Sequence, residues 1–473
     1  MTPLVAGLDQ GTSSTRCVVL DDALHERGAF AVALDSSFPG PGLVEQDPEA
    51  IAASAERAIA GALDAAGARP GDVAALGIAN QTETFVVWDR ASGRAVHPAI
   101  VWQDRRTDDV CAGLRAQGHE ALVRERTGLE LDATFPATKL RWVLDRVGDH
   151  DRLAYGDVAS WLVHRLAGVR VCDAGNAGRS GLCPLGGLEW DDELLELFGI
   201  PRAMLPPVVG TDEIEATLGG IPVRAAAGDQ QSSLFGLRAW EPGAAKVTLG
   251  TGAFVLAHAG HDPPHPPPGV LASCAWRRER VTSYALEGFI PTAGAAVDWF
   301  ARIGALPAGA ELDALLASGE PGAGVVCVPA FQGLGTPRWD AGARGALLGL
   351  SLGSTRADLA RAVVDGILHQ VADAVEAIGV AALSVDGGLS RSDWIVRRLA
   401  DLTGVRVQRT ARADSTALGA ATLAGLAAGV WEGPEALPEV PLDLVAEPGL
   451  AAPERDRARE RWALARDVSS RWR

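Results

Sequence analysis

Four short stretches combine glycine with residues that bind phosphate, metal or hydroxyl groups. The first is Asp9-Gln10-Gly11-Thr12-Ser13-Ser14-Thr15-Arg16, where a carboxylate ends an apolar run and a Gly/hydroxyl turn leads to an arginine. Successive N–H groups in such a turn form an anion-binding nest, and the hydroxyls and the guanidinium add donors. The carboxylate suits a hydrated magnesium ion. An ordinary polar hairpin is the alternative, because neither G-x-G-x-x-G nor a Walker A loop is present.

The other three stretches carry complementary chemistry. Gly228-Asp229-Gln230-Gln231 follows a run of small residues, and an Asp at a strand end in an inter-lobe cleft can be a general base for a substrate hydroxyl. A helix N-cap is the alternative interpretation of Asp229. Leu249-Gly250-Thr251-Gly252 repeats the phosphate-loop chemistry, and Val385-Asp386-Gly387-Gly388 lets the backbone approach a flat ligand such as adenine. The information lies in the order and spacing of all four.

The elements around these stretches alternate between strands and helices. Apolar runs predict strands at residues 5–8, 17–20, 29–34, 73–78 and 85–88. Asp47-Pro48-Glu49 begins a helix, because Asp caps, Pro suits the first turn and Glu faces the positive end of the helix dipole. The first phosphate-binding stretch therefore lies in a turn between two strands.

The second half of the chain repeats this arrangement. A strand at 245–249, a tight turn at Gly250-Thr251-Gly252 and a returning strand at 254–257 correspond to the strand, turn and strand around Gly11. This recurrence predicts two related lobes. The boundary is expected between Gly236 and Gly243, which gives lobes of residues 1–238 and 239–473.

Later segments supply two more helices and a loop. Thr355 and Asp358 fit a capping box before a helix that ends near Ile378, with a short buried strand after it. The Arg-rich stretch 455–473 is typical of a solvated amphipathic helix. Residues 261–269 must form an exposed loop, since prolines supply no N–H to a ladder, and the histidines there are not expected to bind metal.

Composition excludes several classes of protein. The chain has 473 residues, 47% of them hydrophobic and 22% charged, so a large core can form and disorder or a disulfide scaffold is excluded. The net charge of −17 argues against non-specific nucleic-acid binding, because such a surface repels phosphate backbones. Anionic substrates must instead be held by local N–H groups, an arginine or a metal.

A cytoplasmic location without membrane attachment is expected. The sequence begins Met1-Thr2-Pro3-Leu4 without a basic segment, and Asp9 interrupts the apolar start. The most apolar helical stretch, 417–430, is shorter than the roughly 20 residues that a membrane span needs. The six cysteines are scattered and contain no C-x-x-C, which indicates buried thiols rather than ligands or bridges.

With these motifs in place, the chain resembles the FGGY carbohydrate kinases, and within that family the glycerol kinases most closely. One family signature is met by 345–350, Asp358-Leu359 and 362–365, and the other by Pro136, Lys139-Leu140 and Trp142-Val143, with Thr134 outside its usual set. Similar stretches are LDQGTSSTR at 8–16, IVWQDRRT at 100–107, GDQQSSLFG at 228–236, LGTGAF at 249–254, PAFQGLGTPRWD at 329–340 and ALGAATLAGLAAGVW at 417–431. The resemblance covers nearly the whole chain.

The resemblance implies an α/β fold of the actin-like (ribonuclease H-like) ATPase type, with duplicated domains on either side of a nucleotide cleft, and the ligands ATP and Mg²⁺. Magnesium would be bound by Asp9 and Asp229, partly through water. The implied nucleotide-binding residues are Thr12, Ser13, Arg16, Thr251, Gly294, Asp298, Gly388 and Ser392. Two of them depart from the glycerol-kinase pattern, because Asp298 replaces Gln and Ser392 replaces Asn.

On the substrate side, the resemblance makes Asp229 the catalytic base. The implied substrate-binding residues are Thr82, Glu83, Trp102, Thr134, Asp229, Gln230 and Phe254. Glycerol kinases carry Arg and Tyr where this chain has Thr82 and Thr134. A threonine cannot replace the guanidinium fork, and both changes enlarge the pocket. The hypothesis is a substrate bulkier than glycerol, or weak glycerol binding, unless Arg105 or Arg106 compensates.

The sequence thus predicts an ATP-dependent kinase that phosphorylates a hydroxyl of a small polyol or sugar. Glycerol, giving glycerol 3-phosphate, is the leading substrate, and a tetritol, pentitol or ketose of the xylulose or ribulose type is the alternative. A non-catalytic actin-like regulator is more remote, because Asp229, Glu83 and Trp102 occur together. An inactive sensor is disfavoured because Asp9 and Asp229 are both present. Homodimeric and homotetrameric states remain open, as do allosteric effectors.

Overall fold

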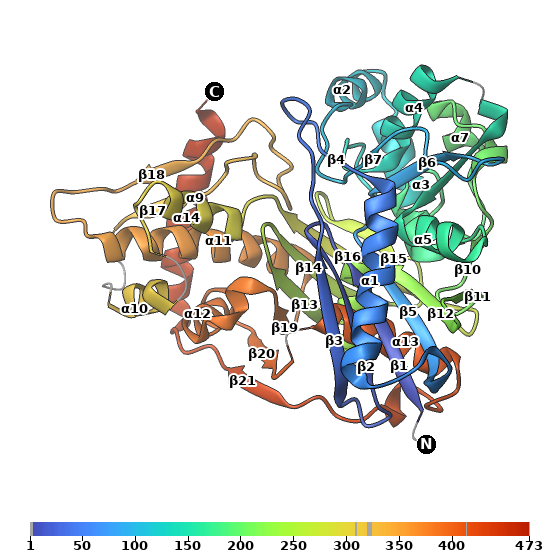
Figure 1. The fold of residues 1–473 in the computed structure, drawn as a ribbon. Helices are drawn as coiled ribbons and strands as arrows, with labels where there is room; N and C mark the ends of the chain where they lie inside the picture. The colour runs from blue at the N-terminus through green and yellow to red at the C-terminus, as the bar shows by residue number, and fades with distance from the viewer. Residues whose placement is uncertain (1–2, 149, 308–309, 319–323, 413, 473) are drawn as a thin grey trace.

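Two mixed β-sheets form the framework of the protein in the computed structural model, which describes residues 3–148, 150–307, 310–318, 324–412 and 414–472 (Figure 1). The first sheet has the order β11 (Ala216–Leu218), β12 (Ile221–Gly228), β5 (Val73–Asn80), β1 (Leu4–Gln10), β2 (Ser14–Leu20), β3 (Glu26–Ala33). The second has the order β15 (Leu271–Arg278), β16 (Val281–Ile290), β14 (Ala253–Gly260), β13 (Ala244–Leu249), β19 (Ala382–Asp386), β20 (Arg406–Thr410), β21 (Leu442–Ala446).

Both sheets contain the same five-stranded unit. In β3-β2-β1-β5-β12 the first two pairings are antiparallel and the next two are parallel. The unit β16-β14-β13-β19-β20 repeats these directions in the same order. The recurrence of strand, turn and strand predicted from the sequence is therefore confirmed as a duplication of the sheet.

Fourteen α-helices among the described residues cover the sheets and connect their strands. In the first half they are α1 (Pro48–Ala66), α2 (Asp108–Ala116), α3 (Glu120–Thr127), α4 (Pro136–Val147), α5 (Val158–Ala167), α6 (Ala174–Arg179), α7 (Asp192–Phe198) and α8 (Asp229–Gly236). In the second half they are α9 (Gly294–Arg302), α10 (Ala310–Ser318), α11 (Arg356–Ile378), α12 (Asp393–Thr403), α13 (Ser415–Ala427) and α14 (Ala452–Arg471).

A smaller sheet extends the first half beside the main one. Its order is β4 (Glu45–Gln46), β7 (Ala99–Ile100), β6 (Phe85–Asp89), β8 (Leu153–Asp157). Two strand pairs complete the structure: β9 (Cys172–Asp173) with β10 (Val208–Val209), and β17 (Val326–Val328) with β18 (Ala346–Leu348). In Figure 1, α2, α3, α4 and α7 gather around this smaller sheet at one end of the molecule.

Helix ends follow their local sequence signals. Asp47 caps α1 by accepting a hydrogen bond from the Glu49 N–H at 3.0 Å, and Pro48 occupies the first turn. In α11 the Thr355 hydroxyl and the Asp358 carboxylate each accept a hydrogen bond from the other's backbone N–H. The predicted starts of both helices and the predicted end of α11 at Ile378 are confirmed.

The helix α13 joins the two halves of the chain. It packs on β1 and β5 of the first sheet and on α8, although it belongs to the second half of the sequence (Figure 1). Two strand glycines allow this contact, because a Cβ at Gly7 would lie 2.0 Å from the Ala417 carbonyl oxygen and one at Gly77 only 1.9 Å from that of Ala420. The predicted boundary between the two lobes, at residues 238 and 239, stays a prediction.

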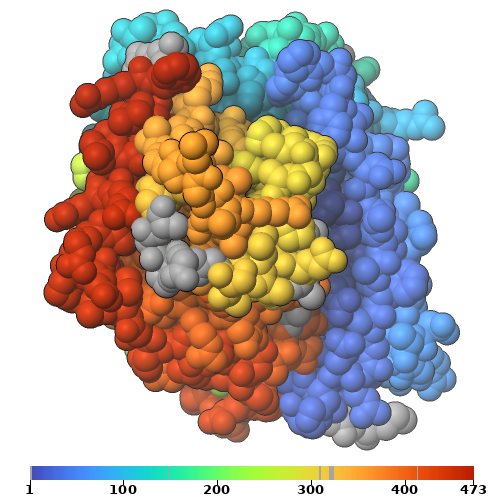
Figure 2. Space-filling view, turned by 90° about the vertical axis from the view of Figure 1, so that its left-hand side faces the viewer, coloured from blue at the N-terminus to red at the C-terminus, as the bar shows by residue number. Residues whose placement is uncertain are grey.

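The C-terminal helix α14 is anchored by one buried tryptophan. Trp462 stacks on His369 of α11 with ring centroids 5.4 Å apart, and its indole N–H donates to Asp373 at 2.9 Å. Arg466 also donates to Asp373. Its buried residues are Trp462, Ala465 and Ser469, and its other side chains are half-buried or exposed. Figure 2 shows the C-terminal residues, in red, on the surface along one edge of the molecule. Arg473, the end of the predicted helix, lies outside the described residues, as do Met1 and Thr2.

The loop at residues 261–269 and the cysteines also agree with the sequence analysis. Residues 261–269 contain neither helix nor strand, and all six cysteines are buried and free. Within the described parts of the chain, none of the helices has the length and apolarity to cross a membrane.

A single methyl group at Gly77 is expected to disrupt the α13 contact. Gly77→Ala should lower the urea midpoint of unfolding by an amount that corresponds to about 1–3 kcal/mol or more, because the new Cβ overlaps a carbonyl oxygen that belongs to a helix backbone. The matched control is Gly71→Ala, since a Cβ there meets nothing within 4 Å. Equal midpoints for the two variants in circular dichroism would contradict this account.

Candidate active site

The hairpin between β1 and β2 presents the first phosphate-binding stretch. Gly11 N–H donates to the Ser14 carbonyl at 2.9 Å and closes the turn, which leaves Ser13 exposed and Thr12 half-buried. Asp9 and Arg16 are cross-strand neighbours at its base. Arg16 lies 3.5 Å from Glu26 and 3.9 Å from Asp414, so its guanidinium already faces acidic groups.

Buried amides hold this hairpin in place. Gln46 Nε2 donates to the Thr12 carbonyl at 2.6 Å, and Gln81 Nε2 donates to Gln46 Oε1 at 2.9 Å and to Gln10 Oε1 at 3.2 Å. Gln81 directly precedes Thr82 and Glu83. The network therefore links the phosphate loop to the segment expected to bind substrate.

The loop between β13 and β14 meets the start of α9. Gly294 N–H donates to the Gly250 carbonyl at 2.8 Å, and Ala293 N–H donates to the Thr251 carbonyl at 2.9 Å. A Cβ at Gly294 would lie 2.7 Å from the Gly250 oxygen, so only glycine permits this approach. The structure thus brings together Thr251 and Gly294. Asp298, one turn further along α9, is exposed.

The fourth stretch borders a cavity of about 310 Å³. Gly387 and Gly388 follow β19 and line this cavity together with Arg409 and Thr410. A Cβ at Gly388 would meet nothing within 4 Å, so open space adjoins the backbone there. Ser392 is buried at the N-cap of α12, where its hydroxyl accepts a hydrogen bond from the Ile395 N–H.

Asp229 is the first residue of α8, directly after β12. The N-cap is Gly228, so the alternative interpretation of Asp229 as a helix cap is wrong. Its carboxylate accepts a hydrogen bond from the Gln230 N–H at 2.8 Å. Burial raises the pKa of Asp229 to about 6, opposed by the positive charge of Lys246 and reinforced by the negative charge of Glu83.

A second acidic group, Asp9, faces the same region. Burial and the charge of Asp229 raise the pKa of Asp9 to about 7, while Arg16 lowers it and Asp386 raises it further. Among the described residues, no hydrogen bond reaches the Asp9 carboxylate, and the buried Asp386 Oδ1 has no partner.

These carboxylates fit a divalent cation held together with phosphate. Their mutual repulsion and the unpartnered oxygen are what a cation would relieve. No group of three or more His, Cys, Asp or Glu side chains in the described residues is arranged to hold a metal by itself. A magnesium ion there would keep several waters and depend on the nucleotide for other ligands, which is its usual behaviour.

Lys246 is a functional candidate that sequence reasoning missed. It is fully buried on β13, and its ammonium group donates to Gln230 Oε1 and, at 2.6 Å, to Thr248 Oγ1. Burial lowers the pKa of Lys246, and the charges of Asp386 and Asp229 raise it. The available signal was a charged residue in the middle of a mostly apolar strand.

The residues expected to bind substrate surround Glu83 and an aromatic wall. Glu83 is 6% exposed and has a φ of +61°, a strained conformation that functional sites often contain. Trp102 and Phe254 lie with ring centroids 6.0 Å apart, and Phe289, which the sequence did not indicate, lies 5.0 Å from Phe254. The Trp102 indole N–H donates to Thr12 Oγ1 at 3.0 Å. This bond connects the wall to the phosphate loop.

The two departures from the glycerol-kinase pattern have local partners. The Thr134 hydroxyl donates to Asp132 Oδ1 at 2.7 Å, and Arg105 binds Asp132 through both terminal nitrogens. Thr82 is buried, with its Cγ2 methyl 2.4 Å from where a Cβ of Gly228 would lie. Its methyl group therefore packs against the backbone just before Asp229.

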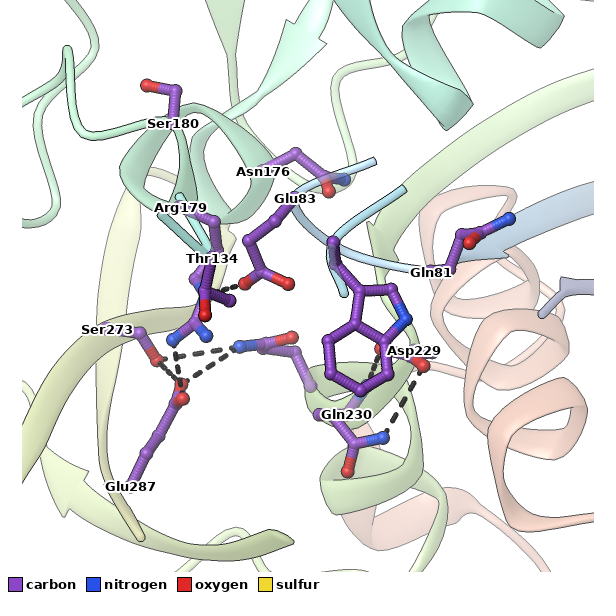
Figure 3. A network of polar contacts seen from close by, with 12 residues as sticks. Gln81, Glu83, Thr134, Asn176, Arg179, Ser180, Asp229, Gln230, Ser273 and Glu287 are labelled. Carbon is purple, nitrogen blue, oxygen red and sulfur yellow. Dashed lines mark hydrogen bonds and ion pairs between the residues drawn. The ribbon is translucent and has the colours of Figure 1, made fainter. Parts of the chain in front are cut away.

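Neither arginine considered as a replacement donor is free. Arg105 is paired with Asp132 and with Asp108, and Arg106 is held by Asp104 and Glu45. The arginine that does reach Glu83 is one that the sequence did not single out. Arg179, at the end of α6, donates from Nε to Glu83 Oε1 at 2.5 Å and from Nη1 to Glu287 of β16 (Figure 3).

Comparisons with known proteins agree with this geometry. Residues 4–236 match the N-terminal domain of the FGGY family of carbohydrate kinases, and residues 245–428 match its C-terminal domain. A glycerol kinase from Aromatoleum aromaticum is 43% identical over 98% of both chains. Glycerol kinase 2 from Thermotoga maritima is 40% identical over 99% of both chains.

Solved structures show the same architecture. The glycerol kinase from Plasmodium falciparum with ADP has a TM-score of 0.91 at 25% identity and covers 99% of this chain, which covers 98% of it in turn. A ligand-bound xylulose kinase from Lactobacillus acidophilus has a TM-score of 0.88 over 98% and 97% of the two chains, and its 21% identity shows the fold alone. The protein belongs to the FGGY family of carbohydrate kinases: it is an ATP-dependent phosphotransferase with a two-domain, actin-like α/β fold.

Proposed function

We propose that the protein transfers the γ-phosphoryl group of ATP to a hydroxyl of a small polyol, with glycerol as the first candidate. The observation that carries this proposal is the arrangement of Glu83 and Asp229 beside the Trp102–Phe254 wall. Two acidic acceptors next to an aromatic surface suit a ligand with hydroxyls on one side and C–H groups on the other. The full-length relatives named glycerol kinase, 40–43% identical, support the choice of glycerol.

A longer polyol or a ketose is the second candidate, and a specific observation favours it. Threonines occupy positions 82 and 134, where glycerol kinases carry larger side chains, and the Thr134 hydroxyl is already bound to Asp132. Thr134 then offers the substrate little, and both threonines are smaller than arginine and tyrosine. As an FGGY kinase, the chain is an enzyme, so a non-catalytic regulator is no longer an alternative.

In this proposal Asp229 starts the reaction. Its carboxylate takes the proton from the acceptor hydroxyl as that oxygen bonds to the γ-phosphorus, and the bond to the β-phosphate oxygen breaks to release ADP. The N–H groups and hydroxyls of Thr12, Ser13 and Thr251 would bind the phosphates. Mg²⁺, held by Asp9 through water and near Asp229, would neutralise phosphate charge. Closure of the lobes would exclude water and limit ATP hydrolysis.

The substrate is tested by a panel of phosphoryl acceptors. ADP release with ATP and Mg²⁺ should be fastest with glycerol at sub-millimolar concentration, compared with tetritols, pentitols and ketoses at matched concentrations. A clear preference for a longer acceptor would instead show that the threonines at positions 82 and 134 suit that substrate. ATP turnover that is independent of every acceptor would contradict the proposed function.

Loss of the base is expected to stop transfer while nucleotide binding continues. Asp229→Asn should lower kcat by about 10²–10⁴-fold, because the amide cannot accept the proton, and should leave the Kd for ADP within a few-fold. In the wild type, kcat should fall as the pH is lowered through about 6, since the raised pKa of Asp229 leaves the carboxylate protonated below that value.

The control for this measurement is Asp64→Asn, an exposed carboxylate on α1. This variant should keep the kcat of the wild type and the same fall in kcat as the pH is lowered through about 6. Near-wild-type turnover in Asp229→Asn would remove this residue from the role of base.

The cavity beside Gly388 is expected to receive the nucleotide. Gly388→Leu should raise the KM for ATP at least about tenfold with little change in stability, because its side chain enters open space that the ligand needs. Gly387→Ala should instead destabilise the fold by about 1–3 kcal/mol, since Gly387 has a φ of +90° and lies against the Leu249 backbone. An unchanged KM for ATP in Gly388→Leu would place the nucleotide elsewhere.

A further inference from the structure

The Arg179 side chain bridges two buried carboxylates, one from each of the two domains. Arg179, Glu83 and Glu287 are 7%, 6% and 5% exposed, and the Arg179 guanidinium donates to both acids. Glu83 follows β5 of the first sheet, whereas Glu287 lies within β16 of the second. Glu287 is held on its other oxygen by Ser273, and Gln231 Nε2 donates to that oxygen at 3.2 Å. Figure 3 shows this chain of contacts.

The Arg179 side chain lies beside both positions where the chain departs from the glycerol-kinase pattern. Its guanidinium carbon is 5.3 Å from the centre of the Phe135 ring, next to Thr134. Ala137 N–H donates to the Ser180 carbonyl at 3.0 Å, which fixes the segment after Arg179 against this stretch. On the other side, Arg179 Nε binds Glu83, the neighbour of Thr82. In Figure 3, Arg179, Glu83 and Thr134 lie together, across from Asp229 and Gln230.

The guanidinium retains donors that no protein group uses. Nε and Nη1 are engaged, but among the described residues no acceptor is hydrogen-bonded to Nη2. This nitrogen is available to an acceptor on a ligand, and a hydrogen bond from a charged donor contributes more than one from a neutral donor. Of the two Glu83 oxygens, only Oε1 is bound by Arg179. The pair therefore offers a donor and an acceptor side by side, which is the pattern that a hydroxyl group satisfies.

We propose that Arg179 is a specificity-determining residue, which donates from Nη2 to a hydroxyl of the polyol while Glu83 accepts from a hydroxyl of the same substrate. Glu287 positions Arg179 for this contact from the second sheet. This inference rests on the proposed function and deepens it, because it assigns the charged donor that Thr82 does not supply. It also makes polyol recognition depend on a contact between the two domains.

The test compares a conservative variant on substrates that differ by one hydroxyl. Arg179→Lys keeps the positive charge between the two glutamates but lacks the guanidinium fork. With glycerol, propane-1,2-diol and propane-1,3-diol as acceptors, the wild type should prefer glycerol in kcat/KM. In Arg179→Lys the preference over the diol that lacks the contacted hydroxyl should shrink about 10- to 100-fold, as expected for a charge-assisted hydrogen bond.

Further kinetic measurements distinguish a role of Arg179 in substrate recognition from a purely structural role. The KM for ATP should stay within about threefold of the wild type, and the change should appear in the KM for glycerol more than in kcat. Introducing Thr82→Arg into Arg179→Lys should recover part of the glycerol affinity. The matched control is Arg126→Lys, since Arg126 forms an exposed ion pair with Glu193. It should leave all three acceptors unchanged.

Equal loss on glycerol and both diols in Arg179→Lys would show a purely structural role and overturn the inference. If that variant does not fold, Glu287→Gln keeps Arg179 and should reduce the same preference, and an unchanged preference there would also overturn it. If the wild type prefers a longer acceptor, that compound and its monodeoxy analogues replace glycerol and the diols. A wild type that phosphorylates no polyol would contradict the proposed function itself.

Discussion

Negative charge buried between the two sheets is the constraint on which the site depends. Burial raises the pKa of both Asp9 and Asp229, and the charges of Asp229 and Asp386 raise the pKa of Asp9 further. Such a cluster is stable only where cations and hydrogen bonds compensate it. Lys246 and Arg179 supply buried positive charge. The negative charge that they do not neutralise is available to a bound cation. The same imbalance of charge suits the cluster to a metal–nucleotide complex.

The duplicated sheet explains why these groups meet. Each five-stranded unit places a hairpin with a glycine-containing turn at corresponding positions, so the Thr12 and Thr251 loops are structural equivalents. Asp229 follows β12, which runs parallel to β1, the first strand of one hairpin. Gly387 follows β19, which runs parallel to β13, the first strand of the other. The helix α13, from the second half of the chain, packs on the first sheet. Gly7 and Gly77 permit this close contact because they have no Cβ. Glycine thus serves the packing between halves as well as the phosphate loops.

The sequence predicts much of this because the deciding signals are local. The cap at Asp47, the capping box at Thr355 and the repeated strand–turn–strand unit depend on neighbouring residues, and the structure contains all three. Contacts between distant segments are different. Arg179 is 96 residues from Glu83 and 108 from Glu287, so no local pattern connects them.

The same limit applies to Lys246 and Phe289. A lysine within a strand gives no sign that its ammonium group will bind Gln230, and Phe289 reads as an ordinary apolar strand residue. The cap that Ser392 provides to α12 is a local contact, and its expected role toward the nucleotide stays a prediction. The roles of the remaining site residues stay proposals, although Thr251 with Gly294 and Trp102 with Phe254 do lie together.

The central claim is that this site delivers phosphate to a hydroxyl rather than to water. Phosphorus NMR of the reaction mixture with ATP, Mg²⁺ and glycerol tests it most directly, because it identifies the product. The account predicts a phosphomonoester of a primary hydroxyl, formed in equal amount with ADP and absent when the polyol is omitted. Inorganic phosphate as the main product, formed at the same rate with and without any polyol, would contradict it.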